Sequence, residues 1–90
     1  MHELSLLADL FRKLDEIAAR ENASRIASVH IRIGALAHIS ADHLKEHFVE
    51  GADGGICENA ALVIDEDTNI NDPHANEIML VSAEVERNSE

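Results

Sequence analysis

The spacing of the apolar residues changes within the first third of the chain. Up to about Arg20 they recur at intervals of three and four, which is the pattern of one face of an amphipathic helix. Beyond Ser28 they alternate with polar residues, as in a strand that buries one face and ends near Gly34. A chain with this beginning has to pack a helix on a sheet. The helical residues are Leu4, Leu7, Leu10, Phe11, Leu14, Ile17 and Ala18, and the alternating ones are Val29, Ile31 and Ile33.

A second helix is predicted after Ser40, a residue suited to cap it. Asp42 falls in the first turn, where the helix dipole favours an anion. Leu44 and Phe48 supply the apolar face, and Gly51 is expected to end the helix.

Two further strands follow. Residues 60–65 form a short continuous apolar run, which predicts a strand more buried than the first. Residues 67–77 are rich in Asn and Asp and favour turns, and residues 78–86 return to a strand pattern in which Val81, Ala83 and Val85 alternate with polar residues. The crossover helix predicts that the first two strands run parallel, and the last two are expected to form a long hairpin. We therefore expect an α+β fold, in the order helix-strand-helix-strand-strand, with two helices packed on one face of a mixed three-stranded sheet.

Length and charge exclude several classes of protein. A chain of 90 residues has apolar material for a single domain, residues 1–90. The formal charge of -11 repels phosphate backbones and anionic lipids, so neither nucleic acid nor a membrane is an expected partner. Cys57 is the sole cysteine, which excludes an internal disulfide and a four-cysteine zinc site and favours a reducing cytoplasm.

The first three residues, Met1-His2-Glu3, form a candidate metal site. The α-amine of Met1, the amide nitrogen of His2 and the Nδ1 atom of its ring can close two chelate rings around one ion. Nitrogen donors in a plane suit Ni(II) or Cu(II). Glu3 can add its amide nitrogen or its carboxylate.

The surroundings of this motif resemble a known family. Met1-His2-Glu3-Leu4-Ser5-Leu6 opens the first helix, and the first strand ends as Val29-His30-Ile31-Arg32-Ile33-Gly34-Ala35-Leu36. The chain is similar here to the HypA/HybF family of hydrogenase nickel-insertion accessory proteins, and the likeness extends through Leu44 and Phe48 to residues 62–66 and 80–86.

The resemblance implies a protein that is not an enzyme and that delivers Ni(II) to the precursor of a nickel enzyme, such as a [NiFe]-hydrogenase, with a maturation GTPase as a further partner. It carries the nickel site to Met1, His2 and Glu3. A further carboxylate of some family members falls at about Ser40, so that ligand is not carried over, and His38 or Asp42 stands near the same place. Where the family has a zinc domain with two Cys-x-x-Cys pairs, this chain has a short loop at 67–77, and no structural zinc is expected.

Two alternatives remain open from the sequence. His43-Leu44-Lys45-Glu46-His47 matches the H-x-x-E-H signature of a metallopeptidase, although two histidines beside an apolar stripe are more often solvated flank residues. The other alternative is a zinc-free relative that acts only as a protein-interaction module.

Overall fold

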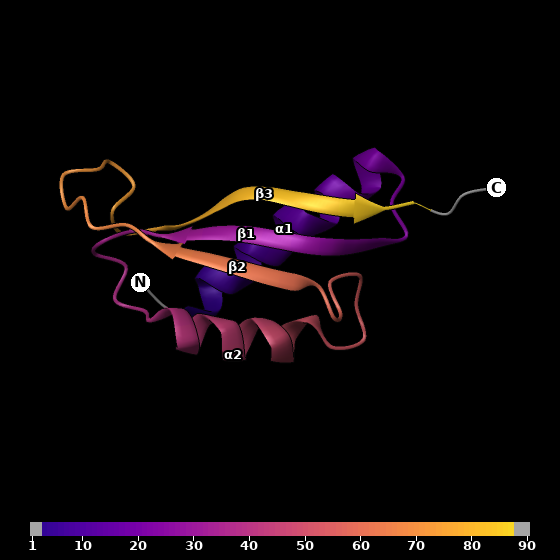
Figure 1. Ribbon diagram of the computed structural model, residues 1–90, viewed down its shortest axis with the longest axis horizontal. Coiled ribbons are helices and arrows are strands. Elements are labelled where there is room, and N and C mark those ends of the chain that lie inside the picture. Colours follow the sequence, from indigo (N-terminus) through magenta and orange to yellow (C-terminus); the bar gives the residue numbers. More distant parts are fainter. Residues whose placement is uncertain (1–2, 88–90) are drawn as a thin grey trace.

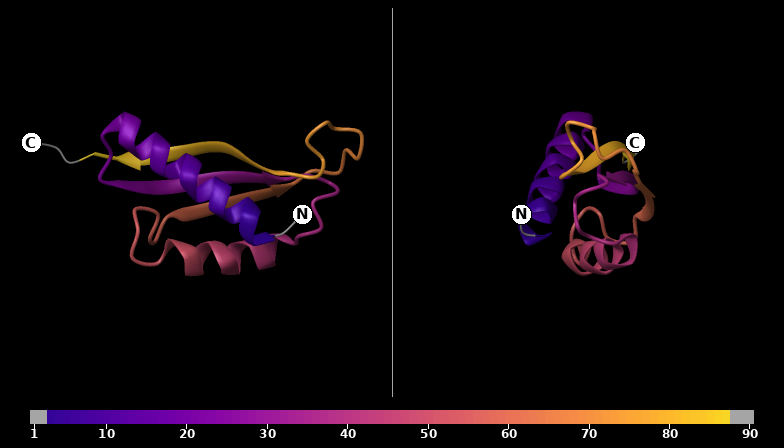
Figure 2. Two further views of the ribbon diagram at one scale, coloured as in Figure 1. Left: turned by 180° about the vertical axis from the view of Figure 1, so that it is seen from behind. Right: turned by 90° about the vertical axis from the view of Figure 1, so that its left-hand side faces the viewer.

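The computed structural model describes residues 3–87, with side chains described from residue 5 onward. The elements are α1 (Glu3–Glu21), β1 (Arg25–Ile33), α2 (Ala41–Ala52), β2 (Ala61–Glu66) and β3 (Ile78–Glu86). Both helices lie on one face of the three-stranded sheet, as Figures 1 and 2 show. The predicted fold class and element order are confirmed.

The order of the strands, β2-β1-β3, corrects the predicted hairpin. β1 is central and pairs parallel to β2 and antiparallel to β3. The loop 67–77 crosses the end of β1 and is bonded to it, since the Gly34 amide donates to the Glu77 carbonyl at 2.8 Å and the Asp67 amide donates to the Ile33 carbonyl at 2.8 Å. This arrangement gives β1 hydrogen-bonding partners on both edges.

β1 is also the most buried strand, which contradicts the expectation that residues 60–65 would be. Ile26, Val29, Ile31 and Ile33 are each at most 3% exposed, whereas β2 has no buried residue. β2 lies at the edge of the sheet, so only Leu62 and Ile64 reach the core, and Val63 on its other face is 52% exposed.

A bulge in β3 overturns the inward position predicted for Val81. The register passes from His30↔Ser82 to Ile31↔Leu80, so Val81 has no partner in β1 and is 44% exposed. An extra residue reverses which side chains face the core. Leu80 therefore packs inward on one side of the bulge, and Ala83 and Val85 on the other.

α2 begins where it was predicted to begin but ends one residue later than predicted. Ser40 is the N-cap, and its hydroxyl accepts from the His43 amide at 3.1 Å. Gly51 does not end the helix, which continues to Ala52. A Cβ atom at Gly51 would lie 2.7 Å from the ring of Phe11, so this glycine serves the contact between the two helices.

The core lies between the helices and the sheet and is almost entirely aliphatic. Phe11 and Phe48 supply its aromatic contact, stacked with ring centroids 5.0 Å apart. Within residues 5–87 no polar or charged residue is buried. The fully buried core side chains are Leu14, Ile26, Val29, Ile31, Leu44 and Phe48.

Candidate metal site

The predicted site falls largely on residues that lie outside the described part of the chain. Met1 and His2 are not described, and Glu3 is described only as the first residue of α1. The first amides of a helix have no acceptor within it. The amide nitrogen of Glu3 is therefore not used by α1, which leaves it available to a metal.

The surroundings of the site are described. The beginning of α1 lies beside the beginning of α2 at one end of the molecule, as the views in Figures 1 and 2 agree. His38 lies in the loop before α2, exposed and with a φ of 59°, and Asp42 is exposed in the first turn of α2. Both residues suggested as further ligands therefore lie at or just before the beginning of α2, the end of that helix that is beside the start of α1.

α2 also carries the two histidines of the H-x-x-E-H sequence. The His43 and His47 rings stand edge to face with centroids 5.4 Å apart. His47 is half-buried, and its Nδ1 atom lies 3.6 Å from the Glu50 carboxylate. Between residues 5 and 87 no group of three or more His, Cys, Asp or Glu side chains is placed to hold a metal ion. The third protein ligand that a peptidase zinc site requires is thus not found among the described side chains.

The remaining histidines are bonded elsewhere. His30 on the outer face of the sheet contacts Asp65 of β2, with 2.6 Å between Nε2 and Oδ2, and His74 in the loop contacts Glu77 at 3.0 Å. The His30–Asp65 pair was missed from the sequence, because it depends on the register between β1 and β2. Their parallel pairing places Asp65 opposite Arg32, diagonal to His30.

Cys57 is a packing residue in the core cluster. It is 3% exposed, and burial together with the charge of Asp15 raises the pKa of its thiol to about 11. Because a metal binds the thiolate, this environment opposes a role for Cys57 as a ligand.

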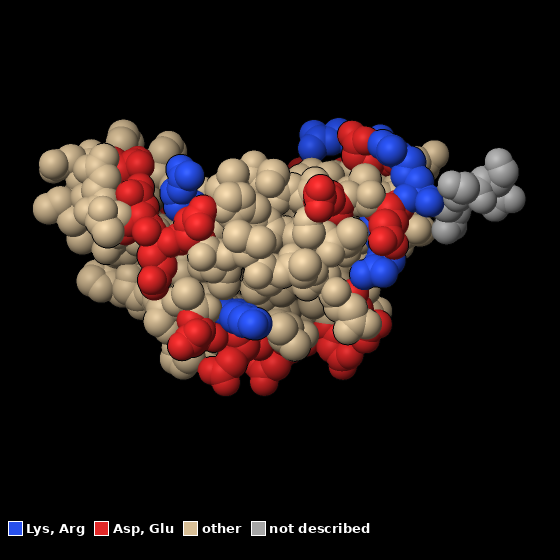
Figure 3. Space-filling model, in the orientation of Figure 1, with Lys and Arg blue, Asp and Glu red and all other residues tan. Residues whose placement is uncertain are grey.

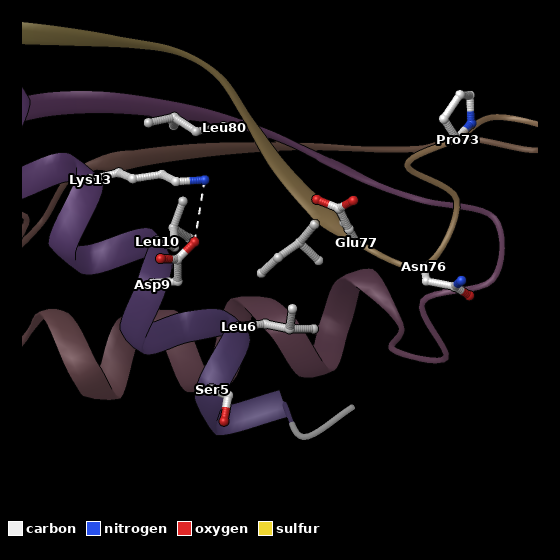
Figure 4. A pocket seen from close by; sticks show the side chains of 10 residues that line it. Ser5, Leu6, Asp9, Leu10, Lys13, Pro73, Asn76, Glu77 and Leu80 are labelled. Atoms are coloured by element: carbon white, nitrogen blue, oxygen red, sulfur yellow. Dashed lines mark ion pairs between the residues drawn. The ribbon is translucent and has the colours of Figure 1, made fainter.

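A hollow of about 410 Å³ lies between α1 and the start of β3. Leu6 and Leu10 line it from α1, and the ammonium group of Lys13 is paired with Asp9 at 3.2 Å (Figure 4). Asp9 and Glu77 supply its carboxylates, and it contains no histidine. The hollow therefore lies near the beginning of α1 without itself having the nitrogen ligands that nickel prefers.

Acidic side chains gather along α2, at the lower edge of Figure 3. They include the exposed residues Asp42, Glu46 and Glu50. Together with the net charge of -11, they favour cations over anions near this end of the fold.

The family model for HypA, described as a hydrogenase/urease nickel incorporation metallochaperone, matches residues 1–71. The chain belongs to the HypA family. This confirms the resemblance found in the sequence, and a metallochaperone family agrees with the expectation that the protein is not an enzyme.

Named relatives extend this result. A hydrogenase maturation factor HypA from Chloroflexus aurantiacus is 41% identical over 66 residues, which are 73% of this chain and 58% of the relative. The HypA of Methanosarcina mazei is 32% identical over 65 residues, which are 72% of this chain and 47% of that one. The chain thus spans about half the length of the HypA relatives that it matches.

Solved HypA structures have the same fold. The solution structure of the Ni metallochaperone HypA from Helicobacter pylori superposes with a TM-score of 0.80 at 20% identity, covering 98% of this chain and 100% of that one. A second HypA solution structure gives a TM-score of 0.71 at 22% identity, with 94% and 96% covered. Neither helix of the described HypA fold is long and apolar enough to cross a membrane.

Proposed function

We propose that this HypA-family chain binds Ni(II) through Met1, His2 and Glu3 and delivers it for the maturation of a nickel enzyme, with a [NiFe]-hydrogenase precursor as the first candidate. The observation that carries the proposal is the match to a nickel-incorporation family from residue 1 onward, so that it includes all three proposed ligands. The named relatives are hydrogenase maturation factors, which supports a hydrogenase as the recipient.

The chemistry of the terminus supports nickel over harder cations. Two chelate rings join the α-amine of Met1, the amide nitrogen of His2 and its Nδ1 atom, and planar nitrogen donors suit Ni(II). Glu3 adds its amide nitrogen or its carboxylate. Since α1 begins at Glu3, deprotonation of this amide costs the helix no internal hydrogen bond.

The proposal includes the remaining properties expected from the sequence. Residues 1–90 act as one nickel-binding domain, the loop 67–77 stands in place of the zinc domain, and no structural zinc is bound. The partners are the nickel-enzyme precursor and a maturation GTPase. The site of action is the cytoplasm, in keeping with a single buried thiol.

Nickel titration of the untagged protein tests the terminal site. We expect about one equivalent to bind, with an affinity that falls as the pH falls, because protons compete for the amine and the imidazole. His2→Ala and a variant with residues fused before Met1 should each lose at least about tenfold in affinity, since each removes one nitrogen donor of the chelate. Equal affinity in all three proteins would exclude the terminal site.

Delivery is tested separately in host cells. Cells that lack this protein should regain nickel-enzyme activity with the wild-type chain and not with His2→Ala. Full activity with His2→Ala would favour a protein-interaction module that does not carry metal.

A further inference from the structure

The first two turns of α2 carry a pair of imidazoles, those of His43 and His47. The ring of Phe11 in α1 lies 2.7 Å from the position that a Cβ atom at Gly51 would take. His47 precedes Gly51 by four residues, about one turn, so it continues along the same flank of the helix, and the His43 ring packs against it from the turn before. The stacking of Phe11 on Phe48 holds the two helices in this arrangement.

The beginning of α1, at Glu3, lies about two helical turns before Phe11. The two helices start side by side at one end of the molecule (Figures 1 and 2). The beginning of α2, which carries His43 and His47 within its first two turns, therefore lies next to the residue at which the proposed nickel-binding segment joins the fold.

We propose that the His43–His47 pair supplies an additional imidazole ligand to the nickel ion held by Met1, His2 and Glu3. This inference rests on the proposed function and names a ligand of the same site. It also gives the pair a different role from the solvated flank favoured by the sequence pattern alone.

The chemistry of the pair fits this role. Imidazole nitrogen is a ligand that nickel prefers, and the two rings are close enough for either to serve one ion. The Glu50 carboxylate lies 3.6 Å from Nδ1 of His47, so its charge favours a cation near this ring. A ligand from α2 would join the terminal segment to the folded domain, so the bound metal would be held at a defined position for transfer.

The test compares nickel binding by untagged wild type, the double variant His43→Gln/His47→Gln, His2→Ala and the control His30→Gln. His30→Gln removes one imidazole from the outer face of the sheet, where His30 contacts Asp65. Affinity is measured by calorimetry, and nickel-edge X-ray absorption counts the bound imidazoles. Circular dichroism verifies that each variant is folded.

We expect the double variant to lose at least about tenfold in affinity and one imidazole from the nickel, since even outer-shell partners of metal ligands contribute that much. His30→Gln should bind like the wild type. Wild-type affinity and imidazole count in the double variant would overturn the inference and leave the terminal site intact, provided that His2→Ala still lowers the affinity. Wild-type binding by His2→Ala would instead show that the terminal site is wrong, and the inference would fail with it.

Discussion

At the scale of single residues, Gly34 lies so close to the backbone of the loop 67–77 that there is no space for a side chain. It follows β1, and a Cβ atom there would lie 2.3 Å from the Ala75 carbonyl oxygen and 2.6 Å from that of His74. The Leu36 amide also donates to the Ala75 carbonyl at 2.7 Å, so this part of the loop is held closely against the chain after β1. Neither neighbour is a flexible side chain that can move aside.

We expect Gly34→Ala to destabilise the protein by about 2 kcal/mol or more, because the backbone of the loop has to move away from β1. Thermal unfolding should then begin roughly 10 °C lower. Gly55→Ala is the matched control, since its Cβ atom would meet the Ala52 carbonyl at an ordinary 3.6 Å. Equal melting temperatures for the two variants would refute this account.

His74 gives the loop a dependence on pH. The hydrogen bond to Glu77, together with the charges of Glu77 and Asp72, raises the pKa of His74 above its ordinary 6.5. A group with a raised pKa in the folded state stabilises that state fully below its unfolded pKa, and the effect is lost as the pH rises through the folded value. We expect an NMR titration of the His74 ring to show the raised pKa and Glu77→Gln to lower it. An unchanged pKa in Glu77→Gln would contradict the pairing.

At the scale of elements, β-bulges decide which side chains the sheet buries. β1 has a register shift between Ile26 and Ser28, which explains why the buried residues Ile26 and Val29 are three positions apart. β3 has the corresponding shift at Val81. If strict alternation is assumed across either bulge, the side chains beyond it are assigned to the wrong face of the sheet.

The same substitution at two valines tests the bulge in β3. Val29→Thr places a hydroxyl group where the side chain is 1% exposed, and we expect a loss of about 1–3 kcal/mol because a buried polar group without a partner is costly. Val81→Thr, at a residue 44% exposed, should change stability by less than about 0.5 kcal/mol. Urea denaturation measures both. A large loss at Val81 would mean that this residue faces the core.

The loop 67–77 is held in its conformation by hydrogen bonds between its own side chains and its backbone. Asp67, Asn69 and Asp72 each accept a hydrogen bond from the amide two residues later, at 3.1, 3.0 and 2.8 Å. These Asx turns give three backbone amides of the loop a hydrogen-bond acceptor within the loop itself. These hydrogen bonds support the proposal that the loop binds no structural zinc.

At the scale of the whole molecule, the aliphatic core is the expected source of stability. Side chains from α1, β1 and α2 form one cluster, to which β3 adds Ile78. Where a structural zinc site contributes on the order of 10 to 16 kcal/mol to folding, its removal unfolds the segment that holds it. A domain stabilised by its core has no such dependence.

We accordingly expect exhaustive chelation to leave the thermal unfolding curve unchanged. Elemental analysis of the purified protein should find no stoichiometric zinc. Added nickel should raise the melting temperature modestly, because a ligand that binds only the folded state stabilises it by mass action. Bound zinc at one equivalent, or loss of the helical circular dichroism signal on chelation, would show that a metal holds the loop 67–77 together.

Much of this protein followed from local patterns. The helices, the three strands, the Ser40 cap and the turn-forming loop were predicted because hydrophobic period and capping preferences act over a few residues. The nickel motif Met1-His2-Glu3 was also evident, since its donors are consecutive along the chain, although its role as a metal site remains a proposal.

Only the tertiary structure decided the properties that depend on contacts between distant segments. Strand order placed β1 at the centre, because pairing on both edges satisfies its backbone while its apolar face is covered by two helices. The bulges turned Val81 outward, and the contact between Phe11 and Gly51 set α2 beside α1. The beginning of α2 thereby lies beside the beginning of α1, about forty residues away in the sequence, a proximity that no periodicity encodes.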